Sequence, residues 1–222
     1  MSFTPLPEIL TDLIDRPEAR RLRAVEIGCG DGRLLALLRR RGLPCVGLDR
    51  MPRAAGSAAD VRGDAGRPPL LPRSLDLVVA ANLVRHLAVG QPRFEFLEAW
   101  VALLKPGGSV FILEDEPTGT LPAAARYRDL QAFLARVMPG HRGALLSLAS
   151  FRRRLSSGMT TRLDGYGVAE NAWLQDAAVA VAMLRGGGPA PGSEADRLAT
   201  AISADGLACG RMWWCRFRAD QD

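Results

Sequence analysis

The stretch Val25-Glu26-Ile27-Gly28-Cys29-Gly30-Asp31-Gly32 decides the fold of this 222-residue chain. Residues 24–27 are apolar apart from Glu26 and predict a short buried strand. Glycines follow at 28, 30 and 32, and leucines at 34, 35, 37 and 38 then recur at helical spacing. Glycine permits tight turns and lets a ligand approach the backbone N–H groups at the start of a helix. The stretch therefore predicts a strand, a ligand-binding turn and a helix.

A series of apolar runs continues this pattern along the first half of the chain. A second buried strand at 45–49 follows the helix, and two strands joined by a helix pair in parallel with a right-handed crossover. Apolar spacing also predicts a helix over 94–104, closed by Lys105-Pro106-Gly107-Gly108. Further strands are predicted at 60–64, 75–80 and 109–113. Continuous apolar runs indicate burial on both faces, so we expect a doubly wound α/β sheet.

The pattern changes after Pro117, where helical and strand signals are mixed. Ser193 is typical of a residue that begins a helix, and we expect that helix to end near Gly206. A final strand is predicted at 212–217. The other predicted elements are helices at 6–14, 121–137, 144–155 and 172–184 and a strand at 160–168.

Two aspartates follow the second and third predicted strands. Asp49 stands 21 positions after Gly28 (49 − 28), and a carboxylate there can accept both hydroxyls of a ribose. Asp64 can accept from an exocyclic amine. Each aspartate alone is more typical of a turn or helix cap. The glycine turn and the two aspartates stand at three successive strand ends, and together they favour a nucleoside site. Arg33 stands where a dinucleotide motif needs its third glycine, which argues against NAD and FAD.

Four stretches, in this order, resemble the class I S-adenosylmethionine-dependent methyltransferases, particularly the type 11 group. They are VEIGCGDG at 25–32, GLDR at 47–50, RGDAGRPPLLPRSLDLVVAANLVRHL at 62–87 and LLKPGGSVFILEDEP at 103–117. The resemblance implies a Rossmann-like, doubly wound α/β sheet of seven strands ordered 3-2-1-4-5-7-6, the last antiparallel, with S-adenosyl-L-methionine as cofactor. The chain departs from the family in its short segment between Asp49 and Asp64, interrupted by Pro52 and Gly56, and in extra helices between its last two strands.

The resemblance also implies a role for each matching residue. The glycine turn would pass the methionine part of the cofactor, the two aspartates would hold its ribose and adenine amine, and Asn82 would lie near the reacting methyl. Ala65 would meet the adenine through its backbone N–H. The implied cofactor-binding residues are Glu26, Gly28, Gly30, Gly32, Asp49, Arg50, Met51, Asp64, Ala65 and Asn82. We expect a single domain over 1–222, with a cofactor half at 1–117, an acceptor half at 118–222 and a helical insertion at about 169–209.

Methyl transfer is an in-line displacement, so the protein mainly has to align the reactants and exclude water. A base is needed only when the acceptor must lose a proton, and the fold therefore forces no catalytic residue. Two weak candidates are His86, after the fourth strand, and Asp115, within Glu114-Asp115-Glu116 at the end of the fifth. The acidic run could orient an amine or another cationic acceptor. The alternatives are a packed helix residue for His86 and solvated charge for the acidic run.

Composition narrows the partners and the location. The net charge is +5 and the pI about 9.5, but Lys105 is the sole lysine among 29 basic residues, which indicates codon bias rather than nucleic-acid binding. The four cysteines form no C-x-x-C pair and the two histidines are far apart, so we expect buried thiols and no metal site. No apolar run is long enough for a membrane span and no secretory signal is visible, so the expected location is cytoplasmic.

The leading hypothesis is a methyltransferase that acts on a small-molecule acceptor. An RNA or protein methyltransferase is the first alternative, and it predicts a basic surface around the cofactor mouth. The arginine runs 39–41 and 152–154 are instead expected at the opposite edge of the sheet, which makes nucleic acid an unlikely partner. A catalytically idle S-adenosylmethionine-binding regulatory module is a further alternative, and a dehydrogenase is the least favoured. The oligomeric state stays open.

Overall fold

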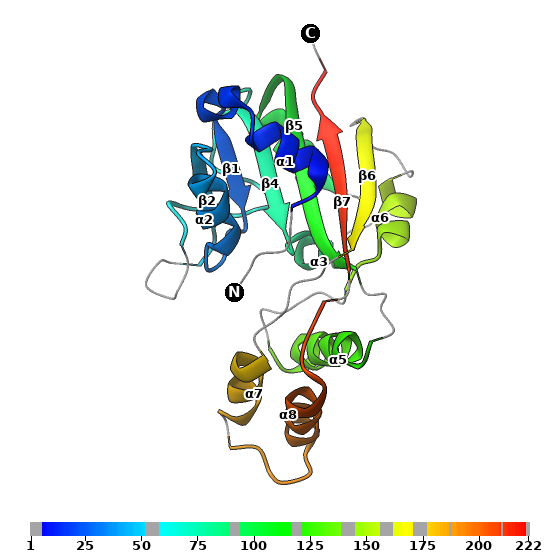
Figure 1. The fold of residues 1–222 in the computed structure, drawn as a ribbon. Coiled ribbons are helices and arrows are strands. Elements are labelled where there is room, and N and C mark those ends of the chain that lie inside the picture. Colours follow the sequence, from blue (N-terminus) through cyan, green and yellow to red (C-terminus); the bar gives the residue numbers. More distant parts are fainter. Residues whose placement is uncertain are drawn as a thin grey trace.

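One seven-stranded sheet organises the described residues of this computed structural model (Figure 1). The described residues are 6–51, 58–88, 94–116, 121–138, 145–155, 162–170, 177–186, 188–209 and 211–220. The strands are β1 (Ala24–Ile27), β2 (Cys45–Asp49), β3 (Val61–Arg62), β4 (Leu75–Ala81), β5 (Leu104–Glu116), β6 (Leu163–Glu170) and β7 (Arg211–Arg218). Their order is β3-β2-β1-β4-β5-β7-β6, and β7 is antiparallel to both of its neighbours. The predicted fold class and strand order are confirmed.

The centre of the sheet is buried on both faces, as the apolar runs predicted. All four residues of β1 are buried, and β1 pairs in parallel with β2 on one side and β4 on the other. Because parallel strands end together, the turn at Gly28 and the carboxyl ends of β2, β4 and β5 meet at one edge. We call this the carboxyl edge.

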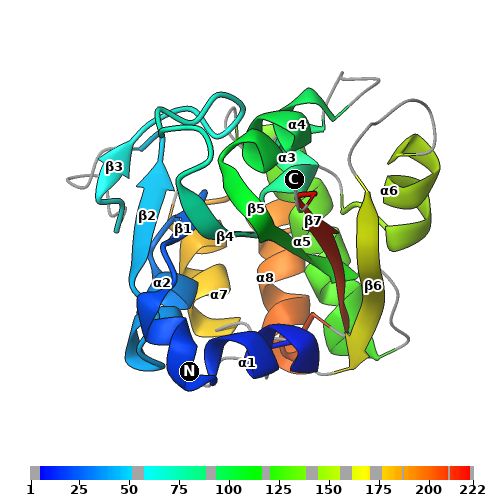
Figure 2. The ribbon, with the colours of Figure 1, turned by 90° about the horizontal axis from the view of Figure 1, so that it is seen from above.

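Helices cover both faces of the sheet (Figure 2). On one face, α2 buries Leu34, Leu35 and Leu38 in a cluster with Val79 of β4. On the other face, Phe151 stacks on Trp213 of β7 with ring centroids 4.9 Å apart. The first face carries α1 (Glu8–Ile14), a short 3₁₀ helix (Pro17–Arg21) and α2 (Arg33–Arg40), and the second carries α3 (Val84–Leu87), α4 (Glu95–Ala102) and α6 (Leu148–Leu155).

Three further helices form a layer beyond the carboxyl edge, which we call the end layer (Figure 1). They are α5 (Pro122–Val137), α7 (Ala177–Arg185) and α8 (Glu194–Asp205). They share their own apolar cluster, which includes Tyr127, Leu130 and Ile202. In the chain, α7 and α8 lie between β6 and β7, where the sequence predicted extra helices. Residues 171–176, at the start of the predicted 172–184 helix, lie outside the described residues.

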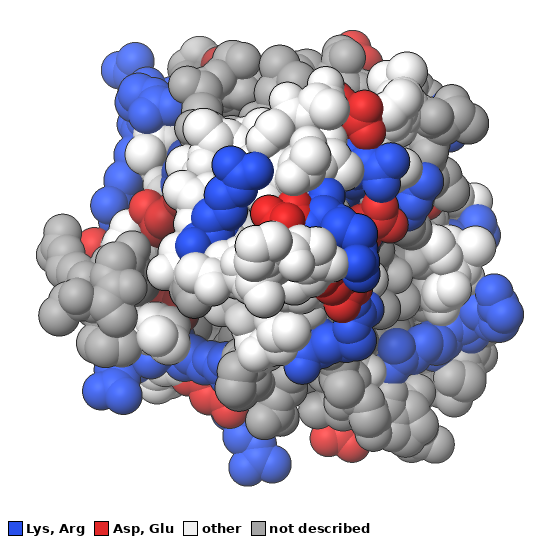
Figure 3. Space-filling model, turned by 90° about the horizontal axis from the view of Figure 1, so that it is seen from below, with Lys and Arg blue, Asp and Glu red and all other residues white. Residues whose placement is uncertain are grey.

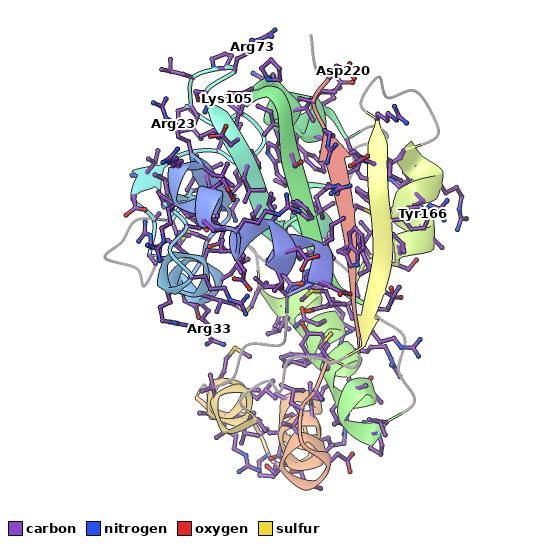
Figure 4. The ribbon with its side chains drawn as sticks, turned by 45° about the horizontal axis from the view of Figure 1, so that its top comes forward. Arg23, Arg33, Arg73, Lys105, Tyr166 and Asp220 are labelled. Atoms are coloured by element: carbon purple, nitrogen blue, oxygen red, sulfur yellow. The ribbon has the colours of Figure 1, made fainter. Side chains whose placement is uncertain are left out.

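The predicted start of the fifth strand was wrong. The strand was expected at 109–113, after a turn at 105–108, but β5 already begins at Leu104, which pairs with Leu75 of β4 before the register shifts. Lys105 Nζ binds both carboxylate oxygens of Asp76, at 2.8 and 2.7 Å, and so holds the glycine-rich segment along β4. Figure 4 shows Lys105 at the edge of the sheet opposite the end layer. The third strand is shorter than predicted, and the 52–57 segment lies outside the described residues.

The four cysteines are buried and free, as the sequence predicted: Cys29, Cys45, Cys209 and Cys215. Within the described ranges, no group of three or more His, Cys, Asp or Glu side chains is placed to hold a metal ion. No helix in that part of the chain has the length and apolar character needed to cross a membrane.

Replacing Ser193 by alanine is expected to lower the free energy of unfolding by about 1 kcal/mol. Ser193 Oγ accepts from the backbone N–H of Asp196 at 3.3 Å, and Asp196 Oδ2 accepts in return from the N–H of Gly192 at 2.9 Å. The first contact satisfies an N–H group that the first turn of α8 leaves without a helical partner, and the second holds the residue before the cap. Urea titration measures the loss. Ser203→Ala, in the last turn of the same helix, is the control, and an equal loss in both variants would contradict the capping role.

Candidate functional site

The turn after β1 needs glycine for two different reasons. Gly28, Gly30 and Gly32 have φ of 72°, 50° and 79°, in the left-handed region that glycine adopts without strain. A Cβ at Gly28 would also lie 2.7 Å from Leu83, and one at Gly32 would overlap Ala58. A Cβ at Gly30 would meet no atom within 4 Å. The first and third glycines are therefore needed for packing, while the second faces open space that a ligand can use.

Asp49 is held at the end of β2 by the same turn. Its Oδ2 accepts from the N–H of Gly30 at 3.0 Å, and its Oδ1 accepts from the N–H of Met51 at 2.9 Å. A carboxylate offers about four lone-pair sites, so each oxygen keeps capacity for another donor. The two backbone contacts fix the direction of the carboxylate, and the remaining capacity fits a pair of hydroxyl groups.

The Asp64 region forms the next part of the edge. Asp64 is exposed, and its Oδ1 accepts from the N–H of Gly66 at 2.8 Å. The carbonyl of Ala65 accepts from the indole N–H of Trp100 in α4, at 2.7 Å, which anchors this backbone to the helix layer. Arg50 is exposed and its carbonyl accepts from Arg62 Nε at 3.2 Å. The segment is thus fixed through its backbone while its polar side chains stay accessible.

A cavity at the carboxyl edge brings many of these residues together. Half of the implied cofactor-binding residues line it, and so does the catalytic candidate His86, which is half-buried. Two apolar lining residues, Leu83 and Leu87, were not predicted from the sequence; they flank His86 on and beside α3. The lining residues are Gly28, Asp49, Arg50, Asp64, Ala65, Leu83, His86 and Leu87. The cavity therefore combines backbone turns, carboxylates and an apolar wall.

The other implied residues lie beside this cavity or behind it. Gly30 and Met51 adjoin it through their bonds to Asp49. Asn82 has φ of 53°, and its Oδ1 accepts from the N–H of Asp115 at 3.0 Å, so it fastens the end of β4 to β5. Glu26 is 3% exposed, and burial, with Asp31 second, raises the pKa of its carboxyl to about 8. Gly32 is buried against Ala58.

Solvated charge was the wrong alternative for the acidic run that ends β5. Glu114 and Asp115 are 1% and 0% exposed, because the end layer and α3 cover them. Glu114 Oε1 accepts from the N–H of Val84 at 2.5 Å, at the start of α3. Asp115 Oδ2 accepts from the hydroxyl of Tyr127 in α5 and lies 3.5 Å from Arg85 Nη1. We call Arg85, Glu114, Asp115 and Tyr127 the buried polar cluster.

Burial and mutual contact shift the protonation of this cluster. Burial raises the pKa of Glu114 to about 7, although Arg85 lowers it. Burial alone would lower the pKa of Arg85, but the surrounding Glu114, Tyr127 and Asp115 raise it above its usual range. Burial and Asp115 also raise the pKa of Tyr127. At neutral pH Arg85 is therefore charged, Tyr127 is a donor, and Glu114 can gain or lose a proton.

The two arginine runs lie in different places. Arg39 Nε donates to the carbonyl of Cys45 at 2.9 Å, at the start of β2 and away from the carboxyl edge, as expected. The expectation was wrong for Arg154, which donates to the carbonyl of Ala88 at 3.0 Å, just after α3, and stacks on Phe94. Its guanidinium is thus engaged inside the fold.

The surface of the end layer carries both signs of charge. Figure 3 views the molecule from that side and shows basic and acidic side chains interspersed. Arg126 pairs with Asp129 and Asp205, and Arg136 pairs with Glu194. This face therefore offers no continuous basic surface among the described residues.

Comparison with known proteins finds similarity to methyltransferases. A family model described as a methyltransferase domain matches residues 25–112. No curated protein matches the chain significantly. An S-adenosylmethionine-dependent methyltransferase from Methanosarcina mazei has a similar structure, with 12% identity, a TM-score of 0.60 and coverage of 99% of this chain and 100% of that one. A second similar structure is described as concerning the conversion of a disulfide bond into a thioacetal group during echinomycin biosynthesis. It has 17% identity, a TM-score of 0.58 and coverage of 99% of this chain and 84% of that one. A putative methyltransferase, in complex with the Trm112 methyltransferase activator of Haloferax volcanii, has 17% identity, a TM-score of 0.55 and coverage of 95% and 88%.

Proposed function

Because this chain is a class I S-adenosylmethionine-dependent methyltransferase, we propose that it methylates a small-molecule acceptor bound between the carboxyl edge and the end layer. The observation that carries the proposal is the position of the end layer, which covers the ends of β4 and β5 through the contact of Tyr127 with Asp115. An acceptor held there would be shielded from water, as methyl transfer requires.

S-adenosylmethionine supplies an electrophilic methyl group when it is bound, and we propose how the chain holds it. Asp49 binds the ribose hydroxyls, since its carboxylate is already oriented by two backbone N–H groups. Asp64 and the backbone of Ala65 bind the adenine, with Arg50 and Met51 beside it. The turn at Gly28, Gly30 and Gly32 passes the methionine part, supported by Glu26, and Asn82 stands near the reacting centre. The open space at Gly30 and the cavity lining fit this assignment.

Two observations favour a small acceptor over RNA. The charges on the end layer are paired and mixed, whereas binding to a phosphate backbone needs a basic surface. One structure similar to this chain belongs to echinomycin biosynthesis, which supports a metabolite as acceptor. The similarity to a methyltransferase bound to an activator makes a partner protein the alternative that a transfer assay has to include.

Replacing Asp49 by alanine is expected to weaken the binding of S-adenosylhomocysteine roughly 10- to 100-fold, because two buried hydroxyl groups lose their acceptor. Titration calorimetry measures the affinity. Asp31→Ala is the control, since Asp31 belongs to the same turn but is exposed and pairs with Arg33. Unchanged affinity in Asp49→Ala would contradict the proposed role of Asp49.

Transfer of a labelled methyl group tests the function itself. The protein would be incubated with labelled S-adenosylmethionine and, separately, with a metabolite library, total RNA and a protein extract. Label in the small-molecule fraction is expected. Label only in RNA or protein would overturn the small-molecule assignment, and binding of S-adenosylhomocysteine without any transfer would indicate an idle regulatory module.

A further inference from the structure

The buried polar cluster joins three parts of the fold at one point. Glu114 and Asp115 come from the end of β5, Arg85 from α3 and Tyr127 from the end layer. All four side chains are at most 7% exposed. Charged side chains are rarely buried this deeply without paired partners, because leaving water is costly for an ion. The composition and contacts of the cluster therefore need a specific explanation.

The cluster contains two carboxyl groups and one guanidinium. Arg85 can balance one negative charge, and its nearest contact to Asp115 is 3.5 Å. Asp115 Oδ2 and Glu114 Oε1 have donors, but Asp115 Oδ1 and Glu114 Oε2 are buried and accept no hydrogen bond. Buried carboxylate oxygens without donors are strongly unfavourable. Arg85 Nη1 is also buried without a hydrogen-bond partner, so the cluster holds two free acceptor oxygens against one free donor. With both carboxyls ionised, it is also short of one positive charge.

The cluster lies directly behind the wall of the cavity. Arg85 and His86 are neighbours on α3, with 3.5 Å between Arg85 Nε and His86 Nε2, and His86 lines the cavity together with Leu83 and Leu87. Asn82, at the end of β4, accepts from the backbone N–H of Asp115. The two donor-deficient carboxyls therefore adjoin the part of the edge where β4 and β5 end.

We propose that the acceptor is a primary or secondary amine, and that Asp115 and Glu114 are the residues that bind its ammonium group. This inference rests on the proposed methyl transfer. An ammonium supplies both missing features, namely N–H donors for the two free oxygens and one positive charge. Tyr127 already donates to Asp115 Oδ2 from the end layer. A bound amine donates to the two oxygens that still lack a donor, Asp115 Oδ1 and Glu114 Oε2.

The same residues account for the proton. The ammonium gives one proton to the Glu114 carboxylate and becomes a neutral amine with a free lone pair. The nitrogen lone pair then forms the new N–C bond to the methyl carbon, the C–S bond breaks, and its electrons stay on the sulfur. The product is a methylated ammonium, and Glu114 passes its proton to solvent. Burial raises the pKa of Glu114 to about 7, so its carboxyl can take up and release a proton near neutral pH.

A panel of matched acceptors tests the proposal. Each primary or secondary amine is paired with the alcohol of the same carbon skeleton, and transfer from labelled S-adenosylmethionine is measured. Transfer is expected to at least one amine and to none of the alcohols. Transfer to alcohols alone, or to no amine in the panel, would overturn the amine assignment. Binding of S-adenosylhomocysteine to the wild-type protein, measured by calorimetry, tests the proposed function separately.

The variant Asp115→Asn removes one negative charge and keeps the shape of the side chain. With the best amine, kcat/KM is expected to fall roughly 10- to 100-fold, mainly through KM, and calorimetric binding of that amine to the S-adenosylhomocysteine-bound protein should weaken equally. S-adenosylhomocysteine affinity should stay within twofold. The control is Asp164→Asn in β6, where a half-buried carboxylate pairs with Arg216 and Arg218. The Asp164→Asn control is expected to lower the melting temperature alone. If Asp115→Asn also lowers the melting temperature alone, Asp115 is purely structural and the proposal is overturned.

Discussion

Replacing Arg85 by methionine is expected to lower the free energy of unfolding by about 3–5 kcal/mol, the range for breaking one side of a buried ion pair. Arg85 is 7% exposed and is the sole cation in the buried polar cluster. Methionine keeps much of the side-chain volume, so packing changes little. The loss arises because Glu114 and Asp115 remain buried without a positive charge. Urea titration at pH 7.5 measures it.

A second substitution separates charge from packing. In Arg85→Met/Glu114→Gln, one of the two uncompensated carboxyls is gone, and a substantial part of the loss should be recovered, since contacting residues do not contribute additively. The control is Arg126→Met, a pair-forming arginine on the surface of α5, for which a much smaller loss is expected. If Arg85→Met and the double variant were equally destabilised, charge compensation by Arg85 would be refuted.

The buried strands and the glycine turn were predictable because their signals are local, whereas the strand order was implied by the resemblance to the methyltransferase family. The glycine turn constrains its own backbone, and continuous apolar runs indicate buried parallel strands without any knowledge of their neighbours. Asp49 ends such a run and Asp64 ends the strand predicted at 60–64, so their place at the edge followed from the strands. The cavity includes both of them. What the pattern did not reveal is that Asp49 also holds the turn through the N–H of Gly30.

The buried polar cluster was not predictable, because its burial is set by distant segments. Charged residues after a strand are usually solvated, and that rule gave the wrong environment for Glu114 and Asp115. The contact from Tyr127 comes from a helix without a recognisable motif. Leu83 and Leu87 were missed since apolar residues after a strand look like ordinary core. The start of β5 at Leu104 was missed because proline and glycine at 106–108 are typical of a turn.

Glu26 gives the stability of the protein an unusual pH dependence, and the variant Glu26→Gln is expected to reveal it. Burial raises the pKa of Glu26 from 4.5 to about 8 in the folded state, so the folded protein binds a proton that the unfolded chain releases above pH 4.5. A group that binds more protons in the folded state than in the unfolded state stabilises the fold at low pH. Its contribution to the free energy of unfolding falls as the pH rises. The contribution of Glu26 is therefore present below about pH 4.5 and is lost progressively up to about pH 8.

The size of this loss follows from the shift, since one pKa unit corresponds to about 1.4 kcal/mol. Between pH 5 and pH 8, wild-type stability should fall by on the order of 3 kcal/mol more than that of Glu26→Gln. The comparison is made between variants because Glu114, with a pKa raised to about 7, adds a fall of the same sign to both. Urea titrations at half-unit pH steps measure the two curves. Glu98→Gln, an exposed position on α4, is the control and should follow the wild type.

Parallel curves for wild type and Glu26→Gln would mean that Glu26 is ionised in the folded protein. Arg39 lowers the pKa of Glu26, but burial outweighs this attraction, and Oε2 of Glu26 is buried without a partner. A proton is therefore the simplest way for this buried carboxyl to remain beside the glycine turn.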